Sequence, residues 1–148
     1  MLFRSKLIAA ARLTRTALRR LGDGACILHT LNVFAKAPPG GSMPTSVARA
    51  AGLAMTKALS HELAPRGIRS NAILVGFIES GQWTRLSADS GRPVQEIYDD
   101  FVTRFAIPMG RVGRAEEFAD VAAFLLSPRA GYVTGTAVNV DGGASPVV

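Results

Sequence analysis

The sequence predicts an α/β fold in which about three parallel strands are flanked by helices. A helix-like run of small and apolar residues covers positions 47–64, and a break with proline and glycine follows it. An apolar run with strand character then covers 68–75. A helix, a short break and a buried strand make half of a βαβ unit, from which parallel sheets are built. Two more β-rich runs, at 25–33 and 136–140, supply the other strands.

The helices follow from apolar residues that recur at helical spacing. In chain order, they are predicted at residues 2–21, 47–64, 93–105 and 115–126. The second has almost no polar face on its first turns, so we expect it to be enclosed between the sheet and another layer. Residues 34–43 are rich in proline and glycine and are predicted to form a loop, whereas residues 81–89 are predicted to be polar and irregular.

Length and composition indicate one domain that spans residues 1–148, of which 48% are hydrophobic. Three parallel strands leave exposed edges, and the outer strands here are apolar, so the sequence is typical of part of a larger sheet. No uncharged apolar run of about 18 residues occurs, so no membrane span is predicted. The single cysteine, Cys26, excludes an intrachain disulfide and favours a reducing compartment, and a cytoplasmic location is expected.

The net charge of +6 is concentrated at the N-terminus, where six basic residues precede the first acidic one, Asp23. The rest of the chain balances eleven basic residues against eleven acidic ones. Such a stretch can be a helix face turned to solvent or to another subunit, an import peptide, or a patch for nucleic acid or anionic lipid. No aromatic residues are interleaved with the charges, as nucleic-acid binding would favour. We therefore favour the helix face and expect neither a nucleic-acid nor a membrane partner.

Three stretches carry a resemblance to a known family. They are AAGLAMTKALSHELAPRGIRSNAILVGFIES (50–80), IPMGRVGRAEEFADVAAFLLS (107–127) and YVTGTAVNVDGG (132–143). In this order and spacing they resemble the C-terminal half of short-chain dehydrogenases/reductases, and the 3-oxoacyl-carrier-protein reductases in particular. The resemblance implies a partial Rossmann-type fold that lacks the N-terminal dinucleotide-binding half, with NAD or NADP as cofactor. It also implies a small carbonyl or alcohol substrate, and a homodimer or homotetramer formed through the first and third predicted helices.

The family's pyrophosphate-binding loop has no counterpart in the sequence. In family members a Gly-x-x-x-Gly-x-Gly turn follows the first strand and brings the pyrophosphate to a helix N-terminus. Here the only candidate, Gly22-Asp23-Gly24, precedes a strand instead. Cofactor binding by this chain alone is therefore doubtful.

The family's catalytic positions are all substituted. The resemblance places Thr45 at the position of the catalytic tyrosine, Arg49 at that of the lysine and Asn32 at that of the serine, with Lys6 at that of a helix asparagine. A phenol titrates near pH 10 and is acidified by an adjacent cation, whereas a threonine hydroxyl is a far weaker acid. Arg49 keeps the positive charge, and can hold ribose hydroxyls or a phosphate, but cannot shuttle a proton. Asn32 can still donate a hydrogen bond to a carbonyl oxygen.

The segment after the strand at 68–75 keeps more of the family pattern. Residues 75–80 resemble a Pro-Gly-x-x-x-Thr motif that contacts the nicotinamide carboxamide in the family: Val75 replaces the proline, Gly76 is kept and Ser80 keeps a hydroxyl. The resemblance makes Val75, Gly76, Ile78 and Ser80 cofactor-binding candidates together with Arg49. An ordinary exit from a strand into a loop is the alternative interpretation. Trp83 and the residues up to Phe105 form either a substrate lid or part of the core. No cluster of histidine, cysteine and acidic residues occurs, so no metal site is expected.

The sequence thus supports an NAD(P)-dependent carbonyl/alcohol oxidoreductase of this family, expected to be truncated and weak or inactive as this chain. The alternative is a non-catalytic oligomerisation module derived from the same family. A binder of nucleic acid or membranes rests only on the N-terminal arginines.

Overall fold

The computed structural model describes residues 4–148, and for Arg4 and Lys6 only the backbone. Its sheet has three parallel strands, β1 (Cys26–Asn32), β2 (Arg69–Val75) and β3 (Ala137–Val140), in the order β1-β2-β3. The helices are α1 (Ala9–Ala17), α2 (Met43–Glu62), α3 (Gly81–Ser90), α4 (Val94–Arg104) and α5 (Ala115–Leu126). The prediction of three parallel strands flanked by helices is confirmed.

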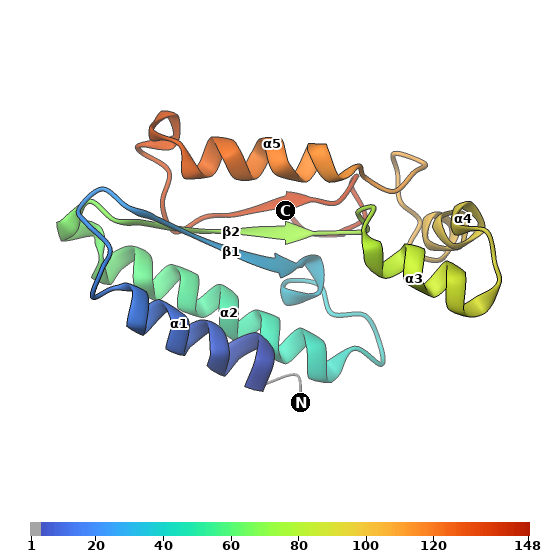
Figure 1. The fold of residues 1–148 in the computed structure, drawn as a ribbon, viewed down its shortest axis with the longest axis horizontal. Helices are drawn as coiled ribbons and strands as arrows, with labels where there is room; N and C mark the ends of the chain where they lie inside the picture. Colours follow the sequence, from blue (N-terminus) through green and yellow to red (C-terminus); the bar gives the residue numbers. More distant parts are fainter. Residues whose placement is uncertain (1–3) are drawn as a thin grey trace.

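The molecule is layered around this sheet (Figure 1). The pair α1 and α2 covers one face of the sheet, α5 covers the other, and α3 and α4 lie beyond the carboxyl ends of the strands. A short π-helix (Arg4–Ile8) leads into α1, and 3-10 turns cover Val33–Ala35, Ala64–Arg66 and Pro128–Ala130. The carboxyl ends of β1 and β2 therefore lie near α3 (Figure 1), at the edge where an open α/β sheet usually binds ligands.

The central strand β2 is buried on both faces, because helices cover both sides of a parallel sheet. Ala72, Ile73 and Leu74 have no exposed surface. The polar Asn71 is equally buried, and its amide is satisfied at both ends: Nδ2 donates to the Val133 carbonyl (2.8 Å) and Oδ1 accepts from Thr136 N (3.2 Å). Both bonds tie β2 to the segment that leads into β3.

The C-terminal end of α5 is held by a buried arginine of β2. Arg69 donates to the carbonyls of Leu125 (2.7 Å) and Ser127 (3.0 Å). The last carbonyls of a helix have no partner within the helix, and a cation placed there satisfies them and interacts favourably with the helix dipole. Burying the charged guanidinium of Arg69 would otherwise cost free energy, and these hydrogen bonds offset that cost.

Three sequence-based expectations need correction or trimming. Residues 81–90 form the helix α3 and are not irregular; Gly91, at φ 69°, ends it. The outer side of α2 is exposed and not enclosed, with Val47 47% accessible. The first helix ends at Ala17 and not at residue 21, and the predicted residues 2 and 3 lie outside the described part. Among residues 4–148, no helix is long and apolar enough to cross a membrane.

Candidate active site

A cavity of about 420 Å³ lies at the carboxyl ends of β1 and β2. It brings together six of the seven predicted site residues, which are Asn32, Arg49, Val75, Gly76, Ile78 and Ser80. The remaining one, Thr45, is joined to the cavity through a hydrogen bond with Arg49. Residues that are as many as 48 positions apart in the sequence therefore meet at one place, as the resemblance implied; their roles stay predictions.

Thr45 and Arg49 lie one turn apart on α2, and Arg49 lines the cavity. The Arg49 Nε donates to Thr45 Oγ1 at 3.0 Å. The guanidinium is half-buried, and burial lowers the pKa of Arg49 below its ordinary value. Arginine nevertheless stays charged at neutral pH, so the site keeps a cation beside a hydroxyl.

Asn32 is the last residue of β1, where the extended backbone turns into the short helix Val33–Ala35. Its Oδ1 accepts a hydrogen bond from Phe34 N at 2.8 Å, which caps that helix. This bond fixes the orientation of the amide and leaves Nδ2 without a protein acceptor within residues 4–148. Asn32 therefore presents a donor at the cavity.

The exit from β2 supplies the opposite wall of the cavity. Gly76 N donates to the Val140 carbonyl at 2.9 Å. A Cβ on Gly76 would lie 2.7 Å from Asp141 Cβ and 2.8 Å from Asp141 Cα. Glycine is therefore required there by packing against the segment after β3, independently of any ligand. Ser80 precedes the first residue of α3 in an extended conformation, and its hydroxyl has no partner among the described residues.

Aromatic side chains from three segments close one side of the cavity. Phe77 stacks on Phe101 (ring centroids 4.6 Å apart) and lies 4.4 Å from Phe105, and Trp83 meets Phe101 edge-on at 4.6 Å. The Trp83 Nε1 donates to the Ile78 carbonyl at 2.9 Å, which satisfies the indole as a half-buried tryptophan requires. Phe77 and Trp83 line the cavity, and Phe101 and Phe105 join them to α4. These aromatic side chains are therefore packed against one another beside the cavity, and a role of the segment as a substrate lid stays a prediction.

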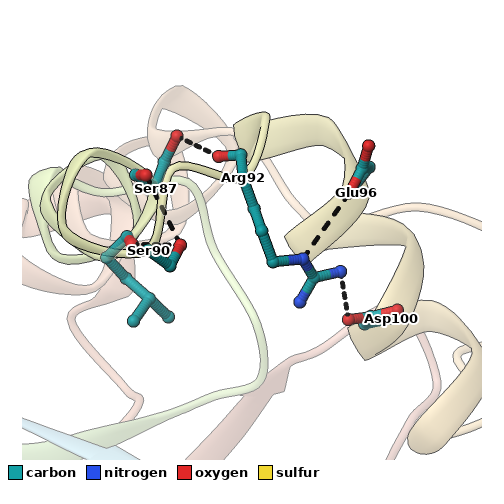
Figure 2. Close-up of polar contacts among 6 residues, drawn as sticks. Ser87, Ser90, Arg92, Glu96 and Asp100 are labelled. Atoms are coloured by element: carbon teal, nitrogen blue, oxygen red, sulfur yellow. Dashed lines mark hydrogen bonds and ion pairs between the residues drawn. The ribbon is translucent and has the colours of Figure 1, made fainter.

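The corner between α3 and α4 is tied by polar contacts centred on Arg92 (Figure 2). Its guanidinium pairs with Asp100 (2.8 Å) and Glu96 (3.5 Å), while its carbonyl accepts from Ser87 Oγ (2.6 Å). The hydrogen bonds and charges of both acids raise the pKa of Arg92. The corner also borders a cavity of about 540 Å³, which is larger than the candidate site but contains none of the predicted site residues. The ion pairs therefore hold the corner between α3 and α4 and do not belong to the candidate site.

Other candidate groups lie elsewhere. Tyr98 lines a separate cavity with Glu79, and burial together with the charge of Glu79 raises its pKa, the opposite of what a catalytic phenol needs. The His29 Nδ1 bonds Thr56 Oγ1 at 2.9 Å, and His61 is exposed on α2. The side chain of Lys6 lies outside the described part. Within residues 4–148 no group of three or more histidine, cysteine or acidic side chains is placed to hold a metal ion.

The cavity is also lined by residues that the sequence did not predict for the site, among them Thr30 and Phe118. Thr30 lies on the same face of β1 as Asn32, so strand alternation could have identified it. Phe118 reaches the cavity from α5, on the far side of the sheet from Arg49. No local signal distinguishes it from any other apolar residue of an amphipathic helix.

The chain is similar to known oxidoreductases. A family model described as enoyl-(acyl carrier protein) reductase matches residues 2–145. Isoepoxydon dehydrogenase of Aspergillus clavatus is 43% identical over 112 residues, which cover 74% of this chain and 40% of that protein. The 3-oxoacyl-[acyl-carrier-protein] reductase of Aquifex aeolicus is 38% identical over 103 residues, covering 70% of this chain and 38% of that enzyme. The chain thus spans less than half the length of these relatives.

A solved structure shows the same arrangement of elements. It is the NADPH-bound form of a short-chain oxidoreductase from Pseudomonas aeruginosa, described as containing an atypical catalytic center. It is 34% identical, with a TM-score of 0.76, and the match covers 93% of this chain and 52% of that one.

Proposed function

The chain belongs to the short-chain dehydrogenase/reductase family, and from this premise we propose that it carries the substrate-side wall of an NAD(P)-dependent enzyme that interconverts a carbonyl and an alcohol. The single observation that carries the proposal is the meeting of Asn32 and Arg49, with its partner Thr45, at the cavity that the exit from β2 closes. A donor amide, a cation and a strand exit converge where parallel sheets bind ligands.

The residues present fit the nicotinamide end of the cofactor. The cavity offers the backbone of Val75, Gly76 and Ile78, the unpartnered hydroxyl of Ser80 and an aromatic side that includes Trp83. The 148 residues contain no glycine-rich loop of the family type for the pyrophosphate. Bound NAD(P)H would supply the hydride, becoming NAD(P)⁺ as the carbonyl carbon is reduced to the alcohol.

The protein groups would act on the carbonyl oxygen by binding and polarising it. Asn32 Nδ2 would donate a hydrogen bond to this oxygen, and the charge of Arg49 would stabilise the negative charge that develops on it. Thr45 is too weak an acid to protonate the alkoxide efficiently, so the proton would come from water. General acid–base catalysis contributes about 10²–10⁴-fold, and the substituted centre would forgo much of it. We therefore expect slow turnover in a complete enzyme with these substitutions, and no measurable turnover from this chain alone.

The Pseudomonas aeruginosa structure supports this proposal. Its description combines an atypical catalytic center with bound NADPH at 34% identity to this chain. A member of the fold with an unusual centre can therefore hold the cofactor.

Titration with NADH and NADPH tests the proposal. A surviving nicotinamide site predicts a saturable change in the fluorescence of the reduced nicotinamide, weakened by Arg49→Gln and unaffected by Arg129→Gln, an exposed arginine outside the cavity. No fluorescence change with either cofactor would contradict the proposal. Carbonyl reduction by this chain alone that Arg49→Ala abolishes would contradict the expected lack of activity.

A second candidate is a non-catalytic oligomerisation module, and the outer face of α2 favours it. Met43 (67% exposed) and Val47 (47%) lie on this face, and Ala50 and Ala54 continue the stripe. Next to it lies an apolar hollow of about 390 Å³ between α2 and the loop at residues 38–42. The outer side of α4, the third predicted helix, carries mostly polar residues. Self-association would therefore use α1 and α2 in preference to α4.

A further inference from the structure

Arg49 is a half-buried cation that lacks a counter-charge. Its Nε is occupied by Thr45 Oγ1, but within residues 4–148 neither terminal nitrogen has a protein acceptor and no carboxylate forms an ion pair with it. The exposed Arg92 and Arg111, by contrast, are each paired with acids. Removing a charge from water without pairing is costly, so a half-buried unpaired guanidinium that lines a cavity points to a ligand of opposite charge.

Two neighbouring side chains add hydrogen-bond donors to this cation. Because Asn32 Oδ1 is occupied by Phe34 N, only its Nδ2 is available to a ligand. Because Thr45 Oγ1 already accepts from Arg49, its hydroxyl hydrogen is free to be donated. The only acidic residue in the lining is Glu79, which is exposed. A neutral ketone oxygen has two lone pairs and cannot satisfy this many donors, whereas a carboxylate offers about four acceptor positions.

The rest of the cavity suits an apolar body. Phe77 and Trp83 form one side of it, and Phe34 and Phe118 also line its wall. The volume of about 420 Å³ is that of a small-molecule site. Guanidinium binds carboxylates and phosphates with equal readiness through its two-pronged geometry, but an aromatic wall favours an organic acid over inorganic phosphate.

We propose that this cavity binds the carboxylate of a small organic acid with an apolar body, held in a two-pronged pair by the terminal nitrogens of Arg49. The inference rests on the proposed function, because it assigns the substrate class of the same site: a carbonyl or alcohol compound that also carries a carboxylate. In this assignment the terminal nitrogens of Arg49 bind the substrate carboxylate, so the polarisation of the carbonyl oxygen would fall to Asn32 Nδ2. The same chemistry would be satisfied by a phosphate, and the experiment separates these sources.

The test uses the fluorescence of Trp83, the single tryptophan of the chain, which lines the cavity. The 148-residue protein is titrated with 3-phenylpropanoate, with its neutral counterpart 3-phenylpropanol and with inorganic phosphate, all without cofactor. We expect saturable binding of the acid, and binding of the alcohol weaker by about tenfold or more, as befits a lost charge-assisted hydrogen bond. Phosphate is expected to compete weakly.

Variants locate the binding. Arg49→Gln should lower the affinity for 3-phenylpropanoate by about tenfold or more. Arg49→Lys should have an affinity between those of the unmodified protein and Arg49→Gln, because an ammonium cannot form the two-pronged pair. Arg129→Gln, with thermal unfolding recorded for each variant, serves as the matched control. If a destabilised Arg49→Gln unfolds, Arg49→Lys and the acid–alcohol comparison still decide the outcome.

The outcomes separate the two proposals. Equal affinity for acid and alcohol, an unchanged affinity in both Arg49 variants, or phosphate binding tighter than the acid would each overturn the inference. Acid binding through Arg49 without any response to NAD(P)H would support the inference while the redox proposal fails. A response to NAD(P)H without acid binding would give the reverse result.

Discussion

At the scale of single residues, Glu117 is the described carboxylate whose pKa is displaced furthest by its neighbours. It pairs with Arg111 at 2.6 Å and accepts the Arg114 backbone N–H at 2.7 Å, at the first turn of α5. The hydrogen bond from Arg111 and the backbone bond from Arg114, with their positive charges, lower the pKa of Glu117 to about 2. The side chain therefore joins the turn at 107–113 to α5, and its negative charge interacts favourably with the positive N-terminal end of that helix.

This environment predicts a pH-dependent stability. The folded pKa is depressed, so the stabilisation is present above the unfolded value of about 4.5 and is lost as pH falls from there toward about 2. Glu117→Gln should lower the melting temperature at pH 6, and the difference from the unmodified protein should shrink steadily below pH 4.5. Differential scanning calorimetry across this range measures it.

Glu116→Gln is the matched control for this measurement. Glu116 lies in the same turn of α5 but forms no ion pair within the described residues, so its loss removes only a favourable interaction with the helix end. The interpretation would be wrong if both variants lowered the melting temperature equally at pH 6, or if the effect of Glu117→Gln persisted unchanged at pH 2.5.

At the scale of elements, the junction of β2 with the segment after β3 depends on Gly76. A methyl group there would lie 2.8 Å or less from two carbons of Asp141, one of them backbone, which cannot move aside as a flexible side chain could. Gly76→Ala is expected to destabilise the fold by about 1–3 kcal/mol, the range for overpacking a close contact. Urea unfolding followed by circular dichroism measures the loss.

Gly22 provides the comparison for this substitution. It has no atom within 4 Å of an added Cβ, and its φ is not positive. Gly22→Ala should therefore change stability by less than about 1 kcal/mol. If Gly76→Ala were equally neutral, the close approach of these two segments would not be a constraint on the fold.

The helices and strands whose bounds follow most closely from the sequence are those with a strong apolar pattern. Residues 115–126 and the strand at 69–75 were predicted within one residue, because burial on the sheet imposes a regular spacing. The helix α3 was missed because it has no buried residue and is rich in turn-forming serine, aspartate and glycine. Contacts with other segments hold α3 in place. Trp83 packs in the aromatic cluster, and Ser87 donates a hydrogen bond to the carbonyl of Arg92 in the next turn (Figure 2).

The outer face of α2 shows the opposite limit. An apolar residue does not reveal whether the surface it prefers to meet belongs to the same chain. Ala48 and Leu59 are buried, whereas Val47 and Ala54 of the same apolar run are exposed. Similarly, the position-equivalent residues Asn32, Thr45 and Arg49 could be located through the family resemblance, but the unpaired state of the guanidinium could only come from the contacts.

At the scale of the whole molecule, the exposed apolar stripe lies beside a concentration of positive charge. Arg12, Arg15, Arg19 and Arg20 are exposed along α1 and the turn after it, and no ion pair among the described residues involves them. Apolar stripes of this kind on a monomer's surface mark protein–protein contacts. A symmetric contact through α1 and α2 would bury the stripe but would also bring two arginine-rich helices together.

This combination predicts self-association that salt strengthens. The apolar contact favours the dimer, whereas like-charge repulsion between the two α1 helices opposes it, and salt screens that repulsion with a Debye length of about 10 Å at 0.1 M. Sedimentation velocity should show a larger dimer fraction at 0.5 M than at 0.05 M NaCl. Val47→Asp should shift the population to monomer at both concentrations, whereas Leu86→Asp, a comparably exposed apolar residue on α3, should not. A clean monomer at every protein and salt concentration would rule out the association, and a dimer weakened by salt would place the contact on another, oppositely charged surface.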